Sequence, residues 1–389
     1  MPDERRRPIS ARMEKANPKC ILCPAEITAA NDSREHIIQN AIGGRKRVKG
    51  LLCINCNTTT GDNWDAEFAR QLQPLSSFFS ITRERGEVPP QLLTTVSGQH
   101  FVRRSDGQLT VARPVYEEVK GETGIRVSIS ARTPKEARQL LNRLKKRYPQ
   151  VDIDLLVPRS EYRYLDEAIK IELNFGGEKS GRSIVKSCVA LAVHSGVKAS
   201  DCYNALEYLT NPRGFPCFGY FHERDLISNR PSEVFHCVAV AGDSVSGLLI
   251  GYAEYFGVYR VVIGMSDRYT GKNFKAVYAI NPISGKEIKG LDIDLALTKA
   301  DIQDAYDYKK IPDGFMAEGA GKVIPIGLAN DFEREKKAAV KRAVEYAFAN
   351  CGAKEGELLT DEQKLKLPKL VTEHLAPFLA HNMQSRRQR

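Results

Sequence analysis

The sequence predicts an α+β protein in which a small metal-stabilised module precedes a larger mixed α/β region with an antiparallel meander and C-terminal helices. Three features predict this: two CxxC pairs near the N-terminus, central segments rich in Val, Ile, Tyr and Phe, and helical periodicity toward the C-terminus. A length of 389 residues with 42% hydrophobic and 27% charged side chains indicates two or three globular domains. A fibrous or wholly disordered chain is excluded.

The chain is basic overall. It has 58 Lys and Arg against 48 Asp and Glu, a net charge of +10 and a pI near 9.0. Such a charge favours a polyanionic partner, with nucleic acid first and an anionic membrane surface second. The sequence has no apolar run of about 18 residues, which a membrane-spanning helix would need. It also has no apolar stretch near its start, which a secretory signal would need. We therefore expect a cytoplasmic protein that does not bind membranes.

Composition divides the chain into five segments. Residues 1–19 are a flexible basic arm with three consecutive arginines, and a nucleic-acid contact and a solvated tail are equally good interpretations of it. The other predicted segments are the metal-stabilised module at 20–75, a connector at 76–120, a mixed α/β domain at 121–330, and C-terminal helices with a basic tail at 331–389.

The clearest secondary structure begins at Gly124. Residues 124–132 alternate apolar and polar side chains as a strand does, and Thr133 with Glu136 three positions later is a helix N-cap pattern. The helix should run to about Tyr148, with a leucine stripe facing inward and its cations facing either water or a phosphate backbone. A second strand is expected at 151–157.

The central strands and the remaining helices follow from the same periodicities. An apolar helix is expected over 183–193, with Ser200 capping the next one. Asn330 and Glu333 resemble a capping box, and a last helix is expected over about 361–383. The meander is expected at 234–241, 248–256, 258–263 and 275–280. Its aromatic side chains favour sheet packing over base stacking: Tyr252, Tyr255, Phe256 and Tyr259.

Cysteine spacing predicts a zinc site. Nine cysteines in a reducing compartment argue against a disulfide framework, because the number is odd. Two CxxC pairs can each form a knuckle and together hold one Zn²⁺ tetrahedrally, and such a closed site is structural rather than catalytic. The five scattered cysteines are expected to be small buried residues. The four predicted ligands of the structural zinc are Cys20, Cys23, Cys53 and Cys56.

A carboxylate, an imidazole and an amide lie between and after these knuckles. The pattern reads Glu35-His36-Ile37-Ile38, then Gly43-Gly44, and Asn57 directly after the last cysteine, with Gly61 four residues on. It resembles the four-cysteine branch of the HNH endonuclease superfamily over residues 18–72. The resemblance implies a ββα-metal fold, in which a two-stranded ribbon and a helix grip one catalytic divalent cation and the zinc lies outside the active centre.

The resemblance also implies roles for three of these residues. His36 would be the general base, and Glu35 and Asn57 would be ligands of a catalytic Mg²⁺ or Mn²⁺. The chemistry agrees, since phosphodiester hydrolysis needs an activated water, a cation against the phosphate oxygens, and positive charge that attracts the polyanion. One carboxylate and one amide leave most positions of a hard cation open to water and phosphate.

Three parts of the sequence depart from or extend the pattern of that branch. Residues 47–50 stand where the superfamily commonly has its middle Asn, so a loop-orienting hydrogen bond is either missing or supplied by Asn55, Asp62 or Asn63. Gln39 stands where the branch usually has proline. Asp65 matches a frequent acidic position, and we expect it to support the site without ligating the cation.

The expected function is a metal-dependent endonuclease that acts on nucleic acid, with DNA favoured and a restriction-like or defence context suggested by analogy alone. A non-catalytic zinc-knuckle nucleic-acid-binding protein and an RNA nuclease are the alternatives, and a homo-oligomer stays open. Four cations between the presumed strands are placed to bind backbone phosphates without reading sequence: Arg45, Lys46, Arg47 and Lys49.

Overall fold

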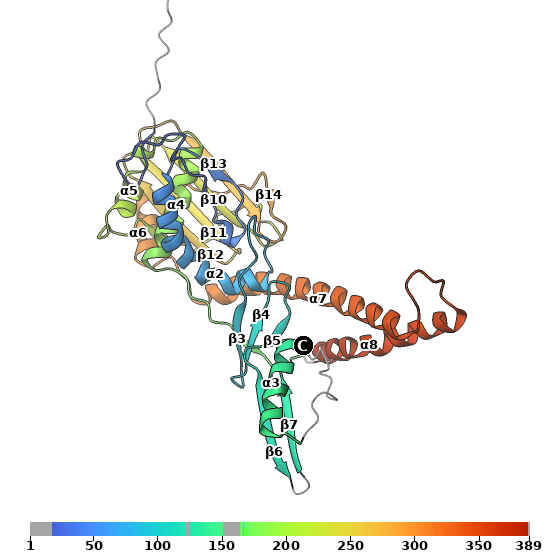
Figure 1. Ribbon diagram of the computed structural model, residues 1–389. Helices are drawn as coiled ribbons and strands as arrows, with labels where there is room; N and C mark the ends of the chain where they lie inside the picture. Colours follow the sequence, from blue (N-terminus) through green and yellow to red (C-terminus); the bar gives the residue numbers. More distant parts are fainter. Residues whose placement is uncertain (1–17, 122–123, 151–163, 166, 388–389) are drawn as a thin grey trace, which may run out of the picture. The chain divides into compact units, whose positions relative to one another are not determined.

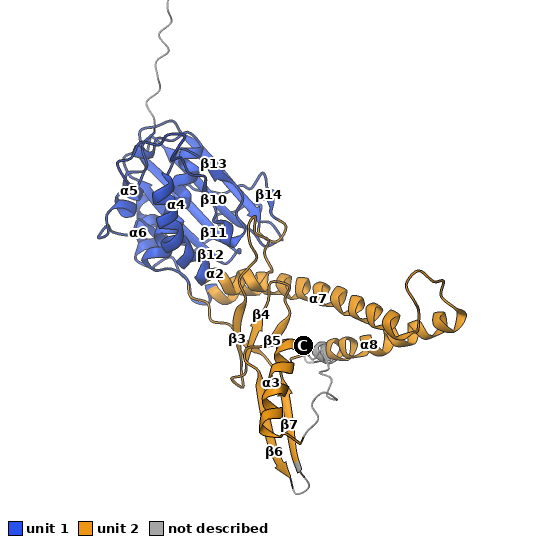
Figure 2. Ribbon diagram, in the orientation of Figure 1, with its two compact units in different colours: residues 1–70, 175–281, 285–315 blue, residues 71–174, 282–284, 316–389 orange. Residues whose placement is uncertain are grey.

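The computed structural model describes residues 18–121, 124–150, 164–165 and 167–387. The chain forms two compact units, each assembled from separate stretches of sequence (Figures 1 and 2). The predicted α+β class is confirmed, because the structure combines a four-cysteine module with ββα elements, antiparallel sheets and long C-terminal helices. Unit 1 consists of residues 1–70, 175–281 and 285–315, and unit 2 of residues 71–174, 282–284 and 316–389.

A six-stranded antiparallel sheet is the centre of unit 1. Its order is β14-β13-β10-β11-β12-β9. Strands β10 to β12 form the expected meander, but β13 pairs with β10 instead of β12, so the meander prediction is wrong at that strand. Periodicity marks a strand and does not identify its neighbour. The strands are β9 (Phe218–Tyr220), β10 (His236–Asp243), β11 (Leu248–Tyr255), β12 (Tyr259–Ser266), β13 (Phe274–Asn281) and β14 (Lys286–Ile288).

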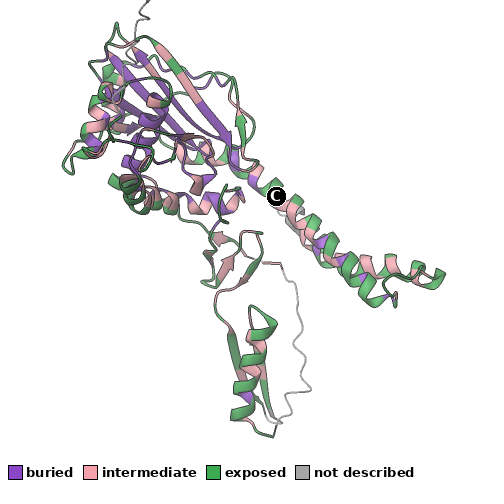
Figure 3. Ribbon diagram, turned by 45° about the horizontal axis from the view of Figure 1, so that its top comes forward, coloured by how far each residue is buried: buried purple, intermediate pink, exposed green. Residues whose placement is uncertain are grey.

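Burial explains why these strands read as continuous apolar runs. Strands β11 and β12 are buried along their whole length, and Figure 3 shows purple concentrated in the sheet of this unit. The aromatic side chains assigned to sheet packing are all buried, which confirms that assignment. They are at most 4% exposed: Tyr252, Tyr255, Phe256 and Tyr259.

Helix α4 (Gly177–His194) packs against the sheet of unit 1. Close approach depends on Gly251 in β11, where an added Cβ would lie 2.9 Å from the Sγ atom of Cys188. The next helix, α5 (Tyr203–Thr210), does not begin at Ser200 as expected. A 3₁₀ turn over Ala199–Asp201 comes first and Cys202 holds the N-cap position, without a side-chain capping bond. Helix α6 (Lys299–Tyr306) packs against β9 and β12.

The N-terminal module supplies the remaining elements of unit 1. A two-stranded antiparallel ribbon pairs β1 (Glu35–His36) with β2 (Arg47–Val48). After the second cysteine pair come α1 (Ile54–Thr60), a π-helical turn over Gly61–Asp65, and α2 (Ala66–Phe78), which continues into unit 2. This succession of ribbon and helix is the ββα arrangement expected from the resemblance.

Unit 2 contains two further sheets and a basic helix. The first sheet has the order β5-β4-β3-β8, formed by β3 (Gln91–Thr95), β4 (His100–Arg103), β5 (Leu109–Val111) and β8 (Ile169–Lys170). The second is the hairpin of β6 (Val115–Gly121) and β7 (Gly124–Ser130). Helix α3 (Pro134–Arg147) follows, and the hydroxyl of Thr133 accepts a hydrogen bond from the Glu136 N–H, which confirms the predicted N-cap. The strand expected at 151–157 lies outside the described residues.

Two long helices complete unit 2. Helix α7 (Phe315–Asn350) runs unbroken through Asn330, so the predicted capping box there is wrong. Asp331 pairs with Arg103 of β4, a long-range contact that sequence spacing cannot reveal. Helix α8 (Asp361–Arg387) confirms the expected last helix, and the His374 ring stacks on Tyr346 of α7. None of the helices in the described part of the chain has the length and hydrophobicity that a membrane span requires.

Candidate functional site

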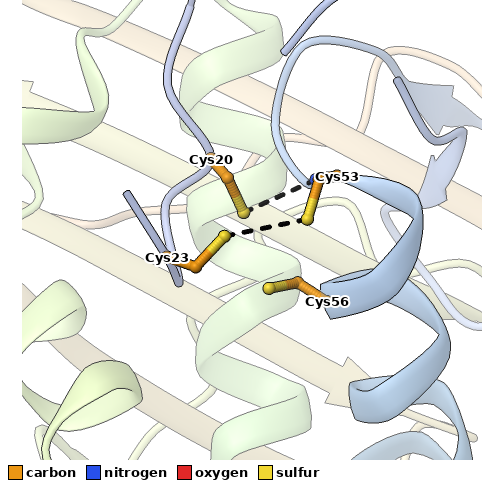
Figure 4. Close-up of side chains that lie close together, drawn as sticks. All are labelled: Cys20, Cys23, Cys53 and Cys56. Atoms are coloured by element: carbon orange, nitrogen blue, oxygen red, sulfur yellow. Dashed lines mark hydrogen bonds between the residues drawn. The ribbon is translucent and has the colours of Figure 1, made fainter. Parts of the chain in front are cut away.

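The four predicted zinc ligands lie together. Their Sγ atoms are all within 4.8 Å of one another, and the Cys23 and Cys53 sulfurs are 3.8 Å apart (Figure 4). A tetrahedral zinc with bonds of about 2.3 Å places its sulfur ligands about 3.8 Å apart. The cluster is therefore consistent with structural zinc. Among the described residues, no other group of three or more His, Cys, Asp or Glu side chains could hold a metal ion.

Two backbone constraints explain why two glycines, Gly43 and Gly44, follow β1. Gly43 adopts φ 97°, a left-handed conformation that favours glycine. At Gly44 an added Cβ would lie 1.6 Å from the carbonyl oxygen of Ile38. Both glycines are thus required for the chain to turn back and form β2, which brings Arg47 opposite His36 in the ribbon.

Glu35 and Asp65 are joined by a buried cation from outside the module. The Nζ atom of Lys186, on α4, lies 2.7 Å from Glu35 Oε1 and 2.6 Å from Asp65 Oδ2, and the Lys186 side chain is 0% exposed. Thr60 Oγ1 is a third acceptor at 3.4 Å. The three ammonium hydrogens of Lys186 therefore have three oxygen acceptors. Asp65 is thus a partner of Lys186, and its expected support of the cation site stays a prediction.

The charges in this cluster are set by burial and by each other. Burial raises the pKa of Glu35 to about 6, with the Lys186 ammonium opposing the rise and the Asp65 carboxylate adding to it. Burial alone would lower the pKa of Lys186, but the carboxylates of Asp65 and Glu35 outweigh that effect, so its pKa is raised. Lys186 therefore keeps its charge between the Glu35 and Asp65 side chains.

Gln39 extends this polar cluster along α4. Its Nε2 atom donates to Ser183 Oγ at 2.7 Å and to Ser187 Oγ at 3.1 Å. The Ser183 hydroxyl in turn donates to Asp65 Oδ1 at 2.5 Å. A proline at position 39, as in most of the resembled branch, could not make these bonds. The departure at Gln39 is therefore tied to the polar side chains of α4.

Two further contacts attach the module to the sheet. The Phe256 N–H donates to His236 Nδ1 at 3.0 Å, so the ring proton is on Nε2, which donates to the carbonyl of Ile42 at 3.0 Å. Burial lowers the pKa of His236 to about 3, which keeps the ring neutral. The Tyr278 hydroxyl accepts hydrogen bonds from the backbone N–H groups of Arg45 and Lys46.

His36 has a different neighbourhood from Glu35. Glu35 is buried and pairs with Lys186 of α4, whereas His36 is only half-buried. Arg47 Nε donates to His36 Nε2 at 3.1 Å. Because arginine can only donate, this bond requires an unprotonated Nε2. In residues 47–50, where the superfamily commonly has its middle Asn, Arg47 therefore supplies a hydrogen bond, and this bond is made to the imidazole of His36.

Asn57 lies on α1 and is partly exposed. Its backbone carbonyl accepts a hydrogen bond from Gly61, and within the described residues no hydrogen bond joins its side chain to Glu35. The structure therefore brings the cysteines together and pairs His36 with Arg47, but the contacts of Glu35 are with Lys186. The roles of Glu35, His36 and Asn57 stay predictions.

The four cations expected to bind phosphate differ in their surroundings. Lys46 Nζ pairs with Glu287 of β14 at 3.0 Å and lies over the Tyr278 ring, and Arg47 is bonded to His36. Arg45 lies against Gly285, and Lys49 is exposed. At least two of the four cations are thus engaged by protein groups.

Sequence reasoning missed Lys186 and the serines beside it. The signal was present, because Lys186 is the single charge within the run Ser183 to Val193, which was interpreted as an apolar helix. A lysine in such a run is buried only when it has a partner. The partners lie more than a hundred positions earlier, so the run alone could not name them.

Comparison with known families supports the same assignment. Residues 20–73 match the model of an HNH endonuclease family. The chain therefore has an HNH endonuclease domain at residues 20–73, with the four-cysteine cluster inside it. Such a domain is typical of nucleases, whose partner is nucleic acid. The search of curated proteins and the search of solved structures found no match.

Loss of one zinc ligand should release the metal and destabilise the protein. We expect the purified chain to contain one zinc, and Cys56→Ser to lose it, because structural zinc contributes about 10–16 kcal/mol of apparent binding free energy in small domains. Elemental analysis and thermal unfolding measure this. Cys351→Ser, a buried cysteine outside the cluster, is the control. A Cys56→Ser variant with full zinc content and unchanged Tm would contradict the zinc assignment.

Removal of the buried Lys186 ammonium should lower the free energy of unfolding. Lys186→Met leaves Glu35 and Asp65 without their counter-ion, and removing one partner of a buried ion pair costs about 3–5 kcal/mol. Urea unfolding of the full chain measures the change. Lys179→Met is the matched control, since Lys179 is exposed on the same helix. Equal stability of the two variants would show that the cluster contributes nothing.

Proposed function

We propose that this protein is a metal-dependent endonuclease that hydrolyses phosphodiester bonds in DNA, with His36 as the general base. The observation that supports this most directly is the Arg47–His36 hydrogen bond inside the HNH domain. It holds the imidazole in place and requires the unprotonated form of Nε2, which is the form that can accept a proton.

Arg47 can serve the reaction twice. A phosphate oxygen is a stronger acceptor for a guanidinium than a neutral imidazole, because the hydrogen bond is then charge-assisted at both ends. When a phosphodiester binds, Arg47 exchanges His36 for the phosphate, and Nε2 is released to take the proton of the attacking water. The role of Arg47 in phosphate binding, predicted from its position, is compatible with its bond to His36.

Glu35 and Asn57 suit a hard divalent cation. Both offer oxygen atoms, and a carboxylate with an amide leaves several positions for water and phosphate, as Mg²⁺ and Mn²⁺ prefer. When bound, such a cation supplies charge stabilisation to the phosphate and leaving oxygens. Lys186 occupies Oε1 of Glu35 and so restricts how that carboxylate can turn.

Substitution of the base separates this proposal from a non-catalytic zinc-knuckle protein. His36→Ala should reduce plasmid cleavage at least about 100-fold, the lower range for loss of general base catalysis, while DNA affinity changes less than about twofold. Exposed His194 on α4 provides the control variant His194→Ala. Wild-type cleavage by His36→Ala would remove the catalytic role. Digestion of duplex DNA, single strands and structured RNA in parallel tests the substrate class. Cleavage of RNA in preference to DNA would identify an RNA nuclease.

A ligand role for Asn57 can be tested without disturbing the buried cluster. Asn57→Ala should raise the Mn²⁺ concentration for half-maximal cleavage about 10-fold or more, as loss of a metal-site group commonly does. A metal titration with plasmid, with a chelator arm, measures it. Thr58→Ala is a matched control, because Thr58 is exposed on the same helix. If both variants need the same Mn²⁺ concentration as wild type, Asn57 is not a ligand.

A further inference from the structure

Helix α3 of unit 2 is strongly basic. It has six Lys or Arg residues and one acidic residue, Glu136. The six cations are all exposed: Lys135, Arg138, Arg143, Lys145, Lys146 and Arg147. The opposite side of the helix is apolar, and Leu144 is buried there. The helix thus has one inward face that packs and one outward face of positive charge.

The outward face is continuous along the helix. At 3.6 residues per turn, positions 135, 138 and 146 lie on one side, and positions 140, 141 and 144, all leucines, lie on the other. Gln139 and Asn142 also fall on the outward side and are exposed. Lys135 further lines a cleft of about 400 Å³ together with Arg104 and Arg132. Cations alternate with hydrogen-bonding amides on this face.

Most of these cations have no acidic partner. The nearby carboxylates are used at the two ends of the helix, where Arg132 pairs with Glu136 at 2.6 Å and Arg147 with Glu118 at 3.0 Å. In the described part of the chain, four cations of α3 make no ion pair. We call them the α3 cations: Lys135, Arg138, Arg143 and Lys146.

Helix α7 shows what ordinary solvated cations look like in this protein. It has six Lys or Arg residues and five acidic ones. Three of its exposed lysines pair with carboxylates three or four positions away: Lys322 with Glu318, Lys336 with Glu333, and Lys341 with Glu345. On α3, like charges occupy such spacings instead, at Lys135 and Arg138 and at Arg143 and Lys146. Like charges at these spacings disfavour a helix, and a bound polyanion relieves them.

We propose that the α3 cations bind the phosphate backbone of duplex DNA. The inference rests on the proposed function for the identity of the polyanion. Lys135 and Lys146 are eleven positions apart, about 16 Å along a helix, and the same length of duplex carries about nine phosphate charges. Within the HNH domain, Lys46 is engaged by Glu287. The α3 cations add phosphate contacts to those that the HNH domain makes.

The test is the salt dependence of binding. The full-length chain with His36→Ala binds a 30-base-pair duplex without added divalent cation, and the binding constant is measured over a range of NaCl concentrations. Replacement of all four α3 cations by Gln should reduce the slope of log K against log salt by about 3–4, since each lost phosphate contact removes about 0.9. The matched control replaces four exposed lysines that are not on α3, namely Lys336, Lys337, Lys341 and Lys364.

The outcomes separate this proposal from the nuclease proposal. An unchanged slope in the α3 variant, or an equal change in the control variant of the same net charge, overturns the α3 surface. Cleavage by the His36→Ala chain overturns the assigned base and leaves the binding result readable. Circular dichroism and Tm of the α3 variant should match the control, because the replaced side chains are exposed. Preference for single strands or for an acidic protein in the same assay would also overturn the duplex assignment.

Discussion

The buried ammonium of Lys186 is the constraint on which the rest of unit 1 depends. A charge with 0% exposure is stable only if its partners are already in place. One partner, Glu35, comes from the ribbon and the other, Asp65, from the helical half of the HNH domain. The two halves of the ββα arrangement are therefore held by one atom from a helix that lies outside the family match.

The HNH domain is therefore an integral part of unit 1. A module appended to a separate domain would make few specific contacts with it. Here the carbonyl of Ile42, just before the Gly-Gly pair, is bonded to His236, the following link is bonded to Tyr278, and Gln39 is bonded to two serines of α4. The sheet and α4 therefore act as the support of the HNH domain, and the ordering of the site is a property of the whole unit.

Local signals in the sequence predicted local structure well. The cysteine spacing, the Gly-Gly pair and the Thr133 cap each depend on residues a few positions apart, and the structure has all three features. The failures are non-local. The partner of β13, the continuity of α7 through Asn330, and the acceptors of Lys186 depend on residues far away in the sequence. Helical periodicity identified α4 but could not tell a buried lysine with partners from an apolar face.

The replacement of the superfamily Asn by the stretch containing Arg47 has a physical consequence of its own. A neutral amide can only orient an imidazole, whereas a guanidinium also carries a charge that attracts phosphate. Under the proposed function, Arg47 leaves His36 when the substrate backbone binds, so that the release of Nε2 is coupled to occupation of the site. Without substrate, the hydrogen bond from Arg47 occupies the acceptor nitrogen of the proposed base.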